Sequence, residues 1–140
     1  MGQITPYLLY EDAAAALDWL SSAFGFKETL RFTDSGGRVS HAEMDAGGGG
    51  QFMLGEPGGG YRGPGHTGHH SCLLHVLVDD VDAHVERARA AGATILAEPV
   101  DKEYGTRSYR VEDLEGHRWD FATQLREVEP EEWGATRSSA

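Results

Sequence analysis

One order of elements occurs twice along this chain, and this repeat restricts the possible folds more than any other feature of the sequence. The segment Tyr10 to Asp12 lies 68 residues before the segment Val78 to Asp80, and both lead into a predicted helix. Gly25 and Gly92, which end those helices, are 67 residues apart. A one-residue deletion in the second helix explains the change in spacing. Helix starts and helix ends that recur at a nearly constant period indicate a duplicated unit with pseudo-twofold symmetry.

The first unit, about residues 4–57, reads as a strand, a helix and three further strands. Apolar and aromatic runs predict strands over residues 4–10, 26–33, 38–45 and 51–55. Asp12 suits the N-cap of the helix, because its carboxylate accepts a free backbone N–H. Apolar residues then recur at three- and four-residue spacing, typical of an amphipathic helix, at Ala13, Ala16, Leu17, Leu20 and Phe24.

The second unit, residues 71–123, repeats this order after a Gly-rich linker over residues 58–70. Asp80 offers the helix N-cap, and strands are predicted over residues 72–78, 93–99, 107–112 and 117–123. Two βαβββ modules place the chain in the α+β class. We expect one domain over residues 1–124, followed by an acidic tail over residues 125–140.

Charge and cysteine content restrict the partners and the compartment. The net charge of −11 argues against nucleic acid as a partner and is compatible with a cationic ligand. The single cysteine, Cys72, excludes an internal disulfide, so we expect a cytoplasmic protein. The N-terminal sequence lacks a signal-peptide pattern, and no apolar run approaches the ~18–20 residues of a membrane span. The histidines of residues 65–70 lack zinc-site spacing and are interpreted as solvated loop residues.

Three stretches carry a resemblance to a known superfamily. ITPYLLYEDAAAALDWLSSAFGF opens the first unit, VDDVDAHVERARAAGA opens the second, and YGTRSYRVEDLEGHRWDF closes it. Together they resemble the vicinal-oxygen-chelate superfamily of glyoxalases, bleomycin-resistance proteins and extradiol dioxygenases, over about residues 4–123. The resemblance implies that the mixed sheets curl and that the two modules form a cup around a ligand cavity. It also implies a homodimer.

In the enzymes of that superfamily, the cup holds a divalent metal whose ligands come from the first and last strands of each module. The matching positions, counted from the helix-entry aspartates, are Thr5, Met53, Leu73 and Asp120. Only Asp120 binds such a cation well, and a small shift in the count would add His75. One carboxylate does not hold a catalytic Zn²⁺, Ni²⁺ or Mn²⁺. We therefore expect no metal cofactor, with His75 and Asp120 as the remaining candidate ligands.

Strand alternation assigns the residues that line the expected cup. The first and last strands contribute one residue each per module, and the middle strands add residues whose face the alternation does not settle. The expected ligand-binding residues are Tyr7, His41, Met53, His75, Arg107, Tyr109 and Asp120. Aromatic faces, a soft thioether and one carboxylate suit a planar or partly cationic small molecule.

Structural explanations compete with these assignments. His75 is also explained as a neutral histidine bonded to backbone. Asp120 lies between two large aromatic residues in a predicted buried strand, where an unpaired charge is costly. An ion pair with Arg107 or Arg110 explains it as well as a ligand does. The sequence is compatible with both a structural and a ligand-binding role for these residues.

Three functions are compatible with these features. The first is a metal-independent binding protein, similar to the bleomycin-resistance branch, that sequesters a planar or cationic drug or natural product. The second is a metal-dependent lyase, isomerase or dioxygenase of the glyoxalase type. The third is a metal-free enzyme with His75 or Asp120 as a base. The missing metal ligands and the acidic chain favour the first, so we lean towards a protein that is not an enzyme.

Overall fold

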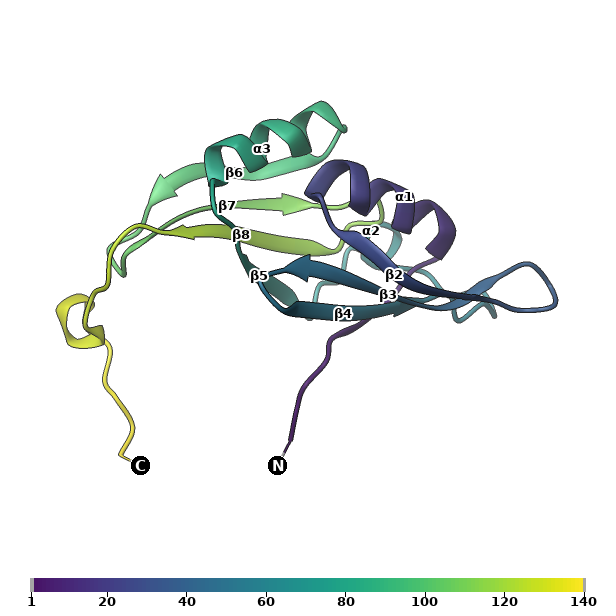
Figure 1. Cartoon of the computed structure of the whole chain (residues 1–140), viewed down its shortest axis with the longest axis horizontal. Helices are drawn as coiled ribbons and strands as arrows, with labels where there is room; N and C mark the ends of the chain where they lie inside the picture. The colour runs from purple at the N-terminus through teal and green to yellow at the C-terminus, as the bar shows by residue number, and fades with distance from the viewer. Residues whose placement is uncertain (1, 140) are drawn as a thin grey trace.

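The computed structural model describes residues 2–139 and contains two successive βαβββ modules (Figure 1). Module one comprises β1 (Tyr7–Leu9), α1 (Ala13–Phe24), β2 (Lys27–Thr33), β3 (Val39–Gly47) and β4 (Gly50–Gly55). Module two comprises β5 (Leu73–Leu77), α3 (Val81–Ala90), β6 (Thr94–Asp101), β7 (Thr106–Glu112) and β8 (Arg118–Gln124). The predicted fold class and the predicted order of elements are confirmed.

Two short elements lie outside the repeat, and one strand is shorter than predicted. The helix α2 (Pro64–Thr67) lies in the segment predicted as a Gly-rich linker, and the 3-10 helix η1 (Pro130–Trp133) lies in the acidic tail. The first strand was predicted over residues 4–10, but its pairing with β4 begins only at Tyr7. Pro6 precedes it and has no backbone N–H with which to extend the ladder.

Each module forms a four-stranded mixed sheet with the same strand order, β1-β4-β3-β2 and β5-β8-β7-β6. The first and last strands of a module are parallel neighbours in both sheets. Tyr7 lies opposite Met53 in module one, and His75 lies opposite Asp120 in module two. These pairs are separated by the sequence period, so the repeat in sequence is also a repeat in space.

The helix ends follow the signals in the sequence. The side chains of Asp12 and Asp80 accept hydrogen bonds from the backbone N–H groups of Ala15 and Ala83, respectively. Gly25 ends α1 with φ of 76°, a left-handed conformation that glycine adopts without steric cost. Over residues 2–139, no helix has the length and apolar character needed to cross a membrane.

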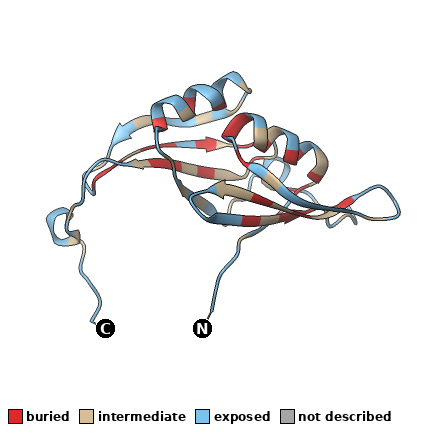
Figure 2. Ribbon diagram, viewed as in Figure 1, coloured by how far each residue is buried: buried red, intermediate tan, exposed pale blue. Residues whose placement is uncertain are grey.

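One aromatic core joins the modules. Helices α1 and α3 lie side by side on the same side of the two sheets, and buried residues concentrate between helices and sheets (Figures 1 and 2). The rings of Phe24 and Phe121 are 4.7 Å apart, and those of Phe52 and Trp119 are 5.4 Å apart. Burying each such side chain contributes ~1.5–3 kcal/mol. Because both modules supply these rings, neither completes its core alone.

Candidate functional site

The sheet faces that no helix covers, which we call the open faces, lie on the inner side of the arch formed by the two modules (Figure 1). In module one, Glu43 of β3 lies opposite Met53 of β4, and Met53 lies opposite Tyr7 of β1. Leu54, the residue after Met53 in β4, is fully buried on the helix side. Because side chains alternate along a strand, Glu43, Met53 and Tyr7 share the open face.

Module two has the same arrangement with different side chains. Arg110 of β7 lies opposite Asp120 of β8, and Asp120 lies opposite His75 of β5. Phe121, the next residue along β8, is fully buried in the core. Arg110, Asp120 and His75 therefore share the open face of module two.

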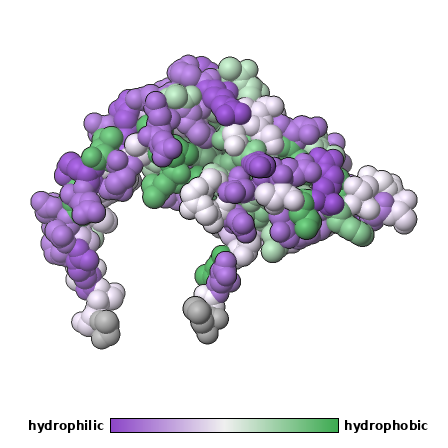
Figure 3. Space-filling model, in the orientation of Figure 1, coloured by the Kyte–Doolittle hydropathy of each residue, from purple (hydrophilic) through white to green (hydrophobic). Residues whose placement is uncertain are grey.

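Large apolar side chains are exposed to solvent on both open faces. On module one, Leu30 and Phe32 of β2 are 45% and 59% exposed. They lie opposite Glu43 and His41, respectively. Figure 3 shows hydrophobic residues gathered near the inner side of the arch. The exposed apolar residues of β5 and β6 in module two are Leu73, Leu77, Leu96 and Val100. Neighbouring exposed apolar side chains, such as Leu30 and Phe32, form a candidate surface for a ligand or a partner.

A chain of hydrogen bonds links three polar side chains on the open face of module one. The hydroxyl of Tyr7 lies 2.9 Å from Nδ1 of His41, and Nε2 of His41 lies 2.8 Å from Oε2 of Glu43. Gly55 makes room for this arrangement, since a Cβ at that position would lie 2.8 Å from the Tyr7 hydroxyl. Pairing of β1, β4 and β3 thus brings together groups that lie far apart in the sequence.

An ion pair occupies the open face of module two. Nε and Nη2 of Arg110 donate to the two carboxylate oxygens of Asp120 at 2.7 and 3.1 Å. The hydrogen bond to Asp120 raises the pKa of Arg110. The pair lines a cavity of about 450 Å³ that Ser108, Arg118 and Tyr104 also line. Asp120 is therefore a neutralised carboxylate, and of the two predicted ion-pair partners the structure selects Arg110.

Most of the predicted site residues lie on the expected faces. The residues placed on the open faces are Tyr7, His41, Met53, His75 and Asp120. They divide between the two modules, so no single cluster contains all five. Their part in ligand binding remains a prediction.

The side chains of Arg107 and Tyr109 bond to groups on the helix side, although Tyr109 also borders the cavity beside Asp120. The sequence did not settle their face, and their part in ligand binding remains a prediction. The hydroxyl of Tyr109 lies 2.6 Å from Nδ1 of His84 on α3. Arg107 donates to Asp82 of α3 and to Asp101 of β6. The pairing of Tyr109 with Phe121 sets this orientation, because Phe121 belongs to the core.

Several residues of the open faces were missing from the predicted site. Glu43 completes the hydrogen-bond chain, and Arg110, which was predicted only as a possible ion-pair partner, shares the open face with Asp120. Leu30 and Phe32 supply exposed apolar surface. Their spacing of two along one strand was the available signal, but it does not tell which face is covered by a helix.

The donor groups do not fit a divalent metal centre. Of the positions that match the superfamily's ligands, Thr5 is exposed and precedes β1, while Leu73 carries no donor. Met53 offers a soft thioether, and Asp120 is bound by Arg110. Among the described residues 2–139, no group of three or more His, Cys, Asp or Glu side chains is placed to hold a metal ion.

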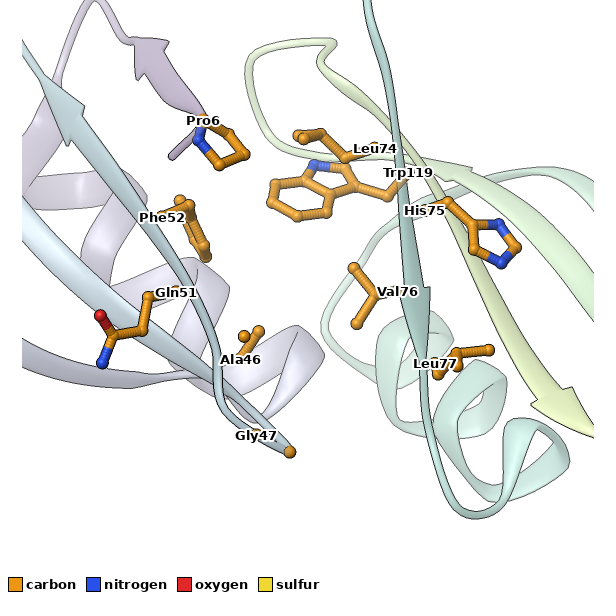
Figure 4. Close-up of a pocket in the computed structure, with 12 residues that line it drawn as sticks. Pro6, Ala46, Gly47, Gln51, Phe52, Leu74, His75, Val76, Leu77 and Trp119 are labelled. Atoms are coloured by element: carbon orange, nitrogen blue, oxygen red, sulfur yellow. The ribbon is translucent and has the colours of Figure 1, made fainter. Parts of the chain in front are cut away.

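A second cavity, of about 310 Å³, lies at the seam between the modules. It is bounded by the β3–β4 hairpin and by β5. Phe52, Val76 and Trp119 line it, whereas the ring of His75 points away from Phe52 and Trp119 (Figure 4). The seam cavity is therefore mainly apolar and continuous with the core side of the sheets.

Sequence relatives cover nearly the whole chain. The profile of the Glyoxalase/Bleomycin resistance protein/Dioxygenase superfamily matches residues 2–121. An uncharacterised protein of Mycobacterium bovis is 34% identical over 141 residues, which cover 97% of this chain and 92% of that protein. An uncharacterised protein of Mycobacterium tuberculosis strain H37Rv is also 34% identical, with 97% and 82% covered.

Solved structures show the same architecture. TioX from Micromonospora sp. ML1 is 38% identical with a TM-score of 0.72, over 91% of this chain and 100% of that one. The fosfomycin resistance protein FosX from Mesorhizobium loti is 16% identical with a TM-score of 0.62, over 87% of this chain and 91% of that one. The likeness to FosX is one of fold.

Two βαβββ modules with the same strand order, each leaving one sheet face uncovered, define a class of two-module α+β proteins. The chain belongs to the glyoxalase/bleomycin resistance protein/dioxygenase superfamily. Because one fold hosts unrelated chemistries, the function has to be argued from the site.

Proposed function

We propose that this protein binds a small, planar or partly cationic organic molecule, such as a drug or natural product, without a metal and without chemistry. The observation that carries the proposal is the make-up of the open faces. Exposed apolar side chains are interrupted by a few polar groups that are already bonded to one another. Ligand pockets commonly combine apolar contact area with a small number of oriented polar groups.

Ring faces and charge support a planar or cationic ligand. Tyr7 and Phe32 are 46% and 59% exposed, so aromatic faces are available for stacking. Glu43 contributes a carboxylate to the same face, and the whole chain carries a net charge of −11. An aromatic face near a carboxylate attracts a cation more than an anion.

The bonding of Asp120 supports binding without a metal. Ligation by Asp120 would break two charge-assisted hydrogen bonds to Arg110. The lyases, isomerases and dioxygenases of the superfamily polarise substrate oxygens with a metal. A site that lacks the donors for that metal favours sequestration over such chemistry.

We also propose a homodimer in the cytoplasm, with the ligand held between open faces of two chains. A single chain leaves Leu9, Leu30 and Phe32 of module one and Leu77 of module two exposed. A second copy covers such surfaces with a self-complementary interface of twofold symmetry. The free and exposed Cys72 supports a reducing compartment.

Metal analysis and a ligand screen test this proposal. Protein purified without a histidine tag is analysed for metals and then screened by thermal shift against polyaromatic and cationic compounds. We expect substoichiometric metal and stabilisation by planar cations, which is about 2.7 kcal/mol at a ligand concentration of 100 Kd. Stoichiometric Zn²⁺, Ni²⁺, Mn²⁺ or Fe²⁺ would instead support a metal-dependent enzyme. A screen without any stabilising compound would overturn sequestration, and a monomer by light scattering would overturn the dimer.

A further inference from the structure

With a neutral imidazole at His41, the chain Tyr7–His41–Glu43 has one hydrogen-bond direction. A carboxylate only accepts hydrogen bonds, so Nε2 of a neutral His41 carries the hydrogen and donates to Glu43 at 2.8 Å. Nδ1 of His41 is then without hydrogen and accepts the hydroxyl hydrogen of Tyr7 at 2.9 Å. The backbone carbonyl of Ser40, 3.4 Å from the same hydroxyl, is also an acceptor. Both protein neighbours of the Tyr7 oxygen are therefore acceptors that compete for its single hydrogen, and neither donates to the oxygen, whose lone pairs are left for other groups.

The backbone fixes the position of this hydroxyl. A Cβ on Gly55 would lie 2.8 Å from the Tyr7 oxygen and 2.4 Å from the Ser40 carbonyl oxygen. Gly55 thus leaves the space in which the phenol meets His41. Tyr7 is 46% exposed and belongs to the open face.

The polar groups of the two open faces differ in charge. In module one, the carboxylate of Glu43 is bonded to an imidazole and not to a permanently charged side chain. In module two, Arg110 compensates Asp120 directly. A cationic or hydrogen-donating end of a ligand is therefore favoured at module one and not at the neutral pair of module two.

We propose that Tyr7 is a specificity-determining acceptor, held in one hydrogen-bond direction by His41 and Glu43, that selects ligands bearing an N–H donor on a cationic ring system. The inference rests on the proposed function, because it names the chemistry of the ligand that the open faces hold. It predicts that a protonated amine is preferred over an equally planar cation that has no N–H.

Two acridine cations separate these ligand classes. 9-Aminoacridine is planar, cationic and rich in N–H donors, whereas 10-methylacridinium is planar and cationic without one. Their affinities are measured by fluorescence titration at about pH 8, where imidazoles are ordinarily neutral. For the wild-type protein we expect tighter binding of 9-aminoacridine. Tyr7→Phe is expected to weaken that binding about tenfold and to leave 10-methylacridinium within about twofold.

A second variant and a matched control sharpen the comparison. His41→Phe removes the nearer acceptor of the Tyr7 hydrogen and leaves only the Ser40 carbonyl at 3.4 Å, so the hydroxyl is held less firmly and the preference for 9-aminoacridine is expected to fall. Tyr61→Phe also removes a phenol hydroxyl, one that donates to the Leu9 carbonyl at 3.3 Å. It is expected to change neither affinity by more than about twofold.

The outcomes separate this inference from the proposed function. If wild-type protein binds both dyes and Tyr7→Phe weakens both equally or neither, the acceptor role is overturned while small-molecule binding stands. If wild-type protein binds neither dye, binding of planar cations is overturned, and the role of Tyr7 with it.

Discussion

The hydroxyl of Tyr10, in module one, donates a 2.6 Å hydrogen bond to the carboxylate of Asp113, in module two. Both residues are buried, and Trp119 donates to the same carboxylate oxygen at 3.1 Å. Backbone N–H groups of Glu115 and His117 donate to the other oxygen at 3.0 Å. Burial and the nearby Asp113 charge raise the pKa of Tyr10 well above its ordinary value. A fully bonded buried carboxylate thus joins the two modules.

Tyr10→Phe is expected to lower the free energy of unfolding by about 1.5–3 kcal/mol, because it removes a hydrogen bond to a buried charged group. Urea unfolding followed by circular dichroism measures the change. Tyr61→Phe removes a hydroxyl from a half-buried residue that donates to the neutral Leu9 carbonyl, so it serves as the control and is expected to stay within about 1 kcal/mol. Equal losses in the two variants would contradict a special role for the bond to Asp113.

His84 links α3 to module one in its neutral form. Its Nε2 donates to the Phe24 carbonyl at 3.2 Å, and its Nδ1 accepts from the Tyr109 hydroxyl at 2.6 Å. Burial lowers the pKa of His84 from 6.5 to about 4. Between these values the unfolded chain binds a proton that the native state does not. The contribution of His84 to stability is therefore complete above about pH 6.5 and is lost as the pH falls towards about 4.

Unfolding free energies of wild-type protein and His84→Gln at about pH 7.5 and pH 5 check this dependence. We expect the wild-type protein to lose more stability on acidification than the variant, because glutamine does not titrate. His69→Gln, in the exposed linker, is expected to retain the wild-type loss. An unchanged pH slope in His84→Gln would show that other groups cause the acid sensitivity.

Gly55→Ala is expected to destabilise the protein by about 1–3 kcal/mol, because the added Cβ would lie 2.4 Å from the Ser40 backbone oxygen. Thermal unfolding measures this loss. Gly36→Ala is the comparison, since its nearest neighbour is a side-chain oxygen of Asp34 at 3.4 Å. A variant at position 55 as stable as the one at position 36 would mean that β3 and β4 separate at low cost.

Asp120→Ala is expected to weaken binding of a cationic ligand, because it leaves the Arg110 charge uncompensated on the open face, and to leave the metal content unchanged. Stability should change little, since the Arg110 side chain is 44% exposed and can be solvated by water. Asp82→Ala removes an ion-pair partner of Arg107 on the helix side and is expected to leave binding intact. Titration with a screened ligand and metal analysis check both variants. Loss of a bound metal in Asp120→Ala would overturn the metal-free interpretation.

The starts of both helices, the end of the first and the order of strands were readable from the sequence, because local chemistry decides them. Asp12 and Asp80 cap their helices through their own carboxylates, and Gly25 ends α1 with a positive φ. The repeat period also makes Tyr7 equivalent to His75, and Met53 equivalent to Asp120. In the structure each module joins one member of each equivalent pair, because Tyr7 lies opposite Met53 and His75 lies opposite Asp120.

The orientation of β7 was predicted only in part from residue types. One face carries Arg107, Tyr109 and Val111, and the other carries Ser108, Arg110 and Glu112, so Tyr109 and Val111 indicate the core face while the charge of Arg107 argues against it. Pairing with β8 makes the choice, because it places Tyr109 beside Phe121 under α3.

By itself, the sequence determined the duplicated βαβββ architecture. It also determined that few metal-binding side chains occupy the positions that match the superfamily's ligands. Both features depend on residue type and spacing. Only the tertiary structure decided that Arg110 neutralises Asp120 and that Tyr7, His41 and Glu43 form one hydrogen-bonded chain. Those contacts join separate strands across a sheet. Their partners are set by strand register and by which face the helices cover, and neither is encoded in a local pattern.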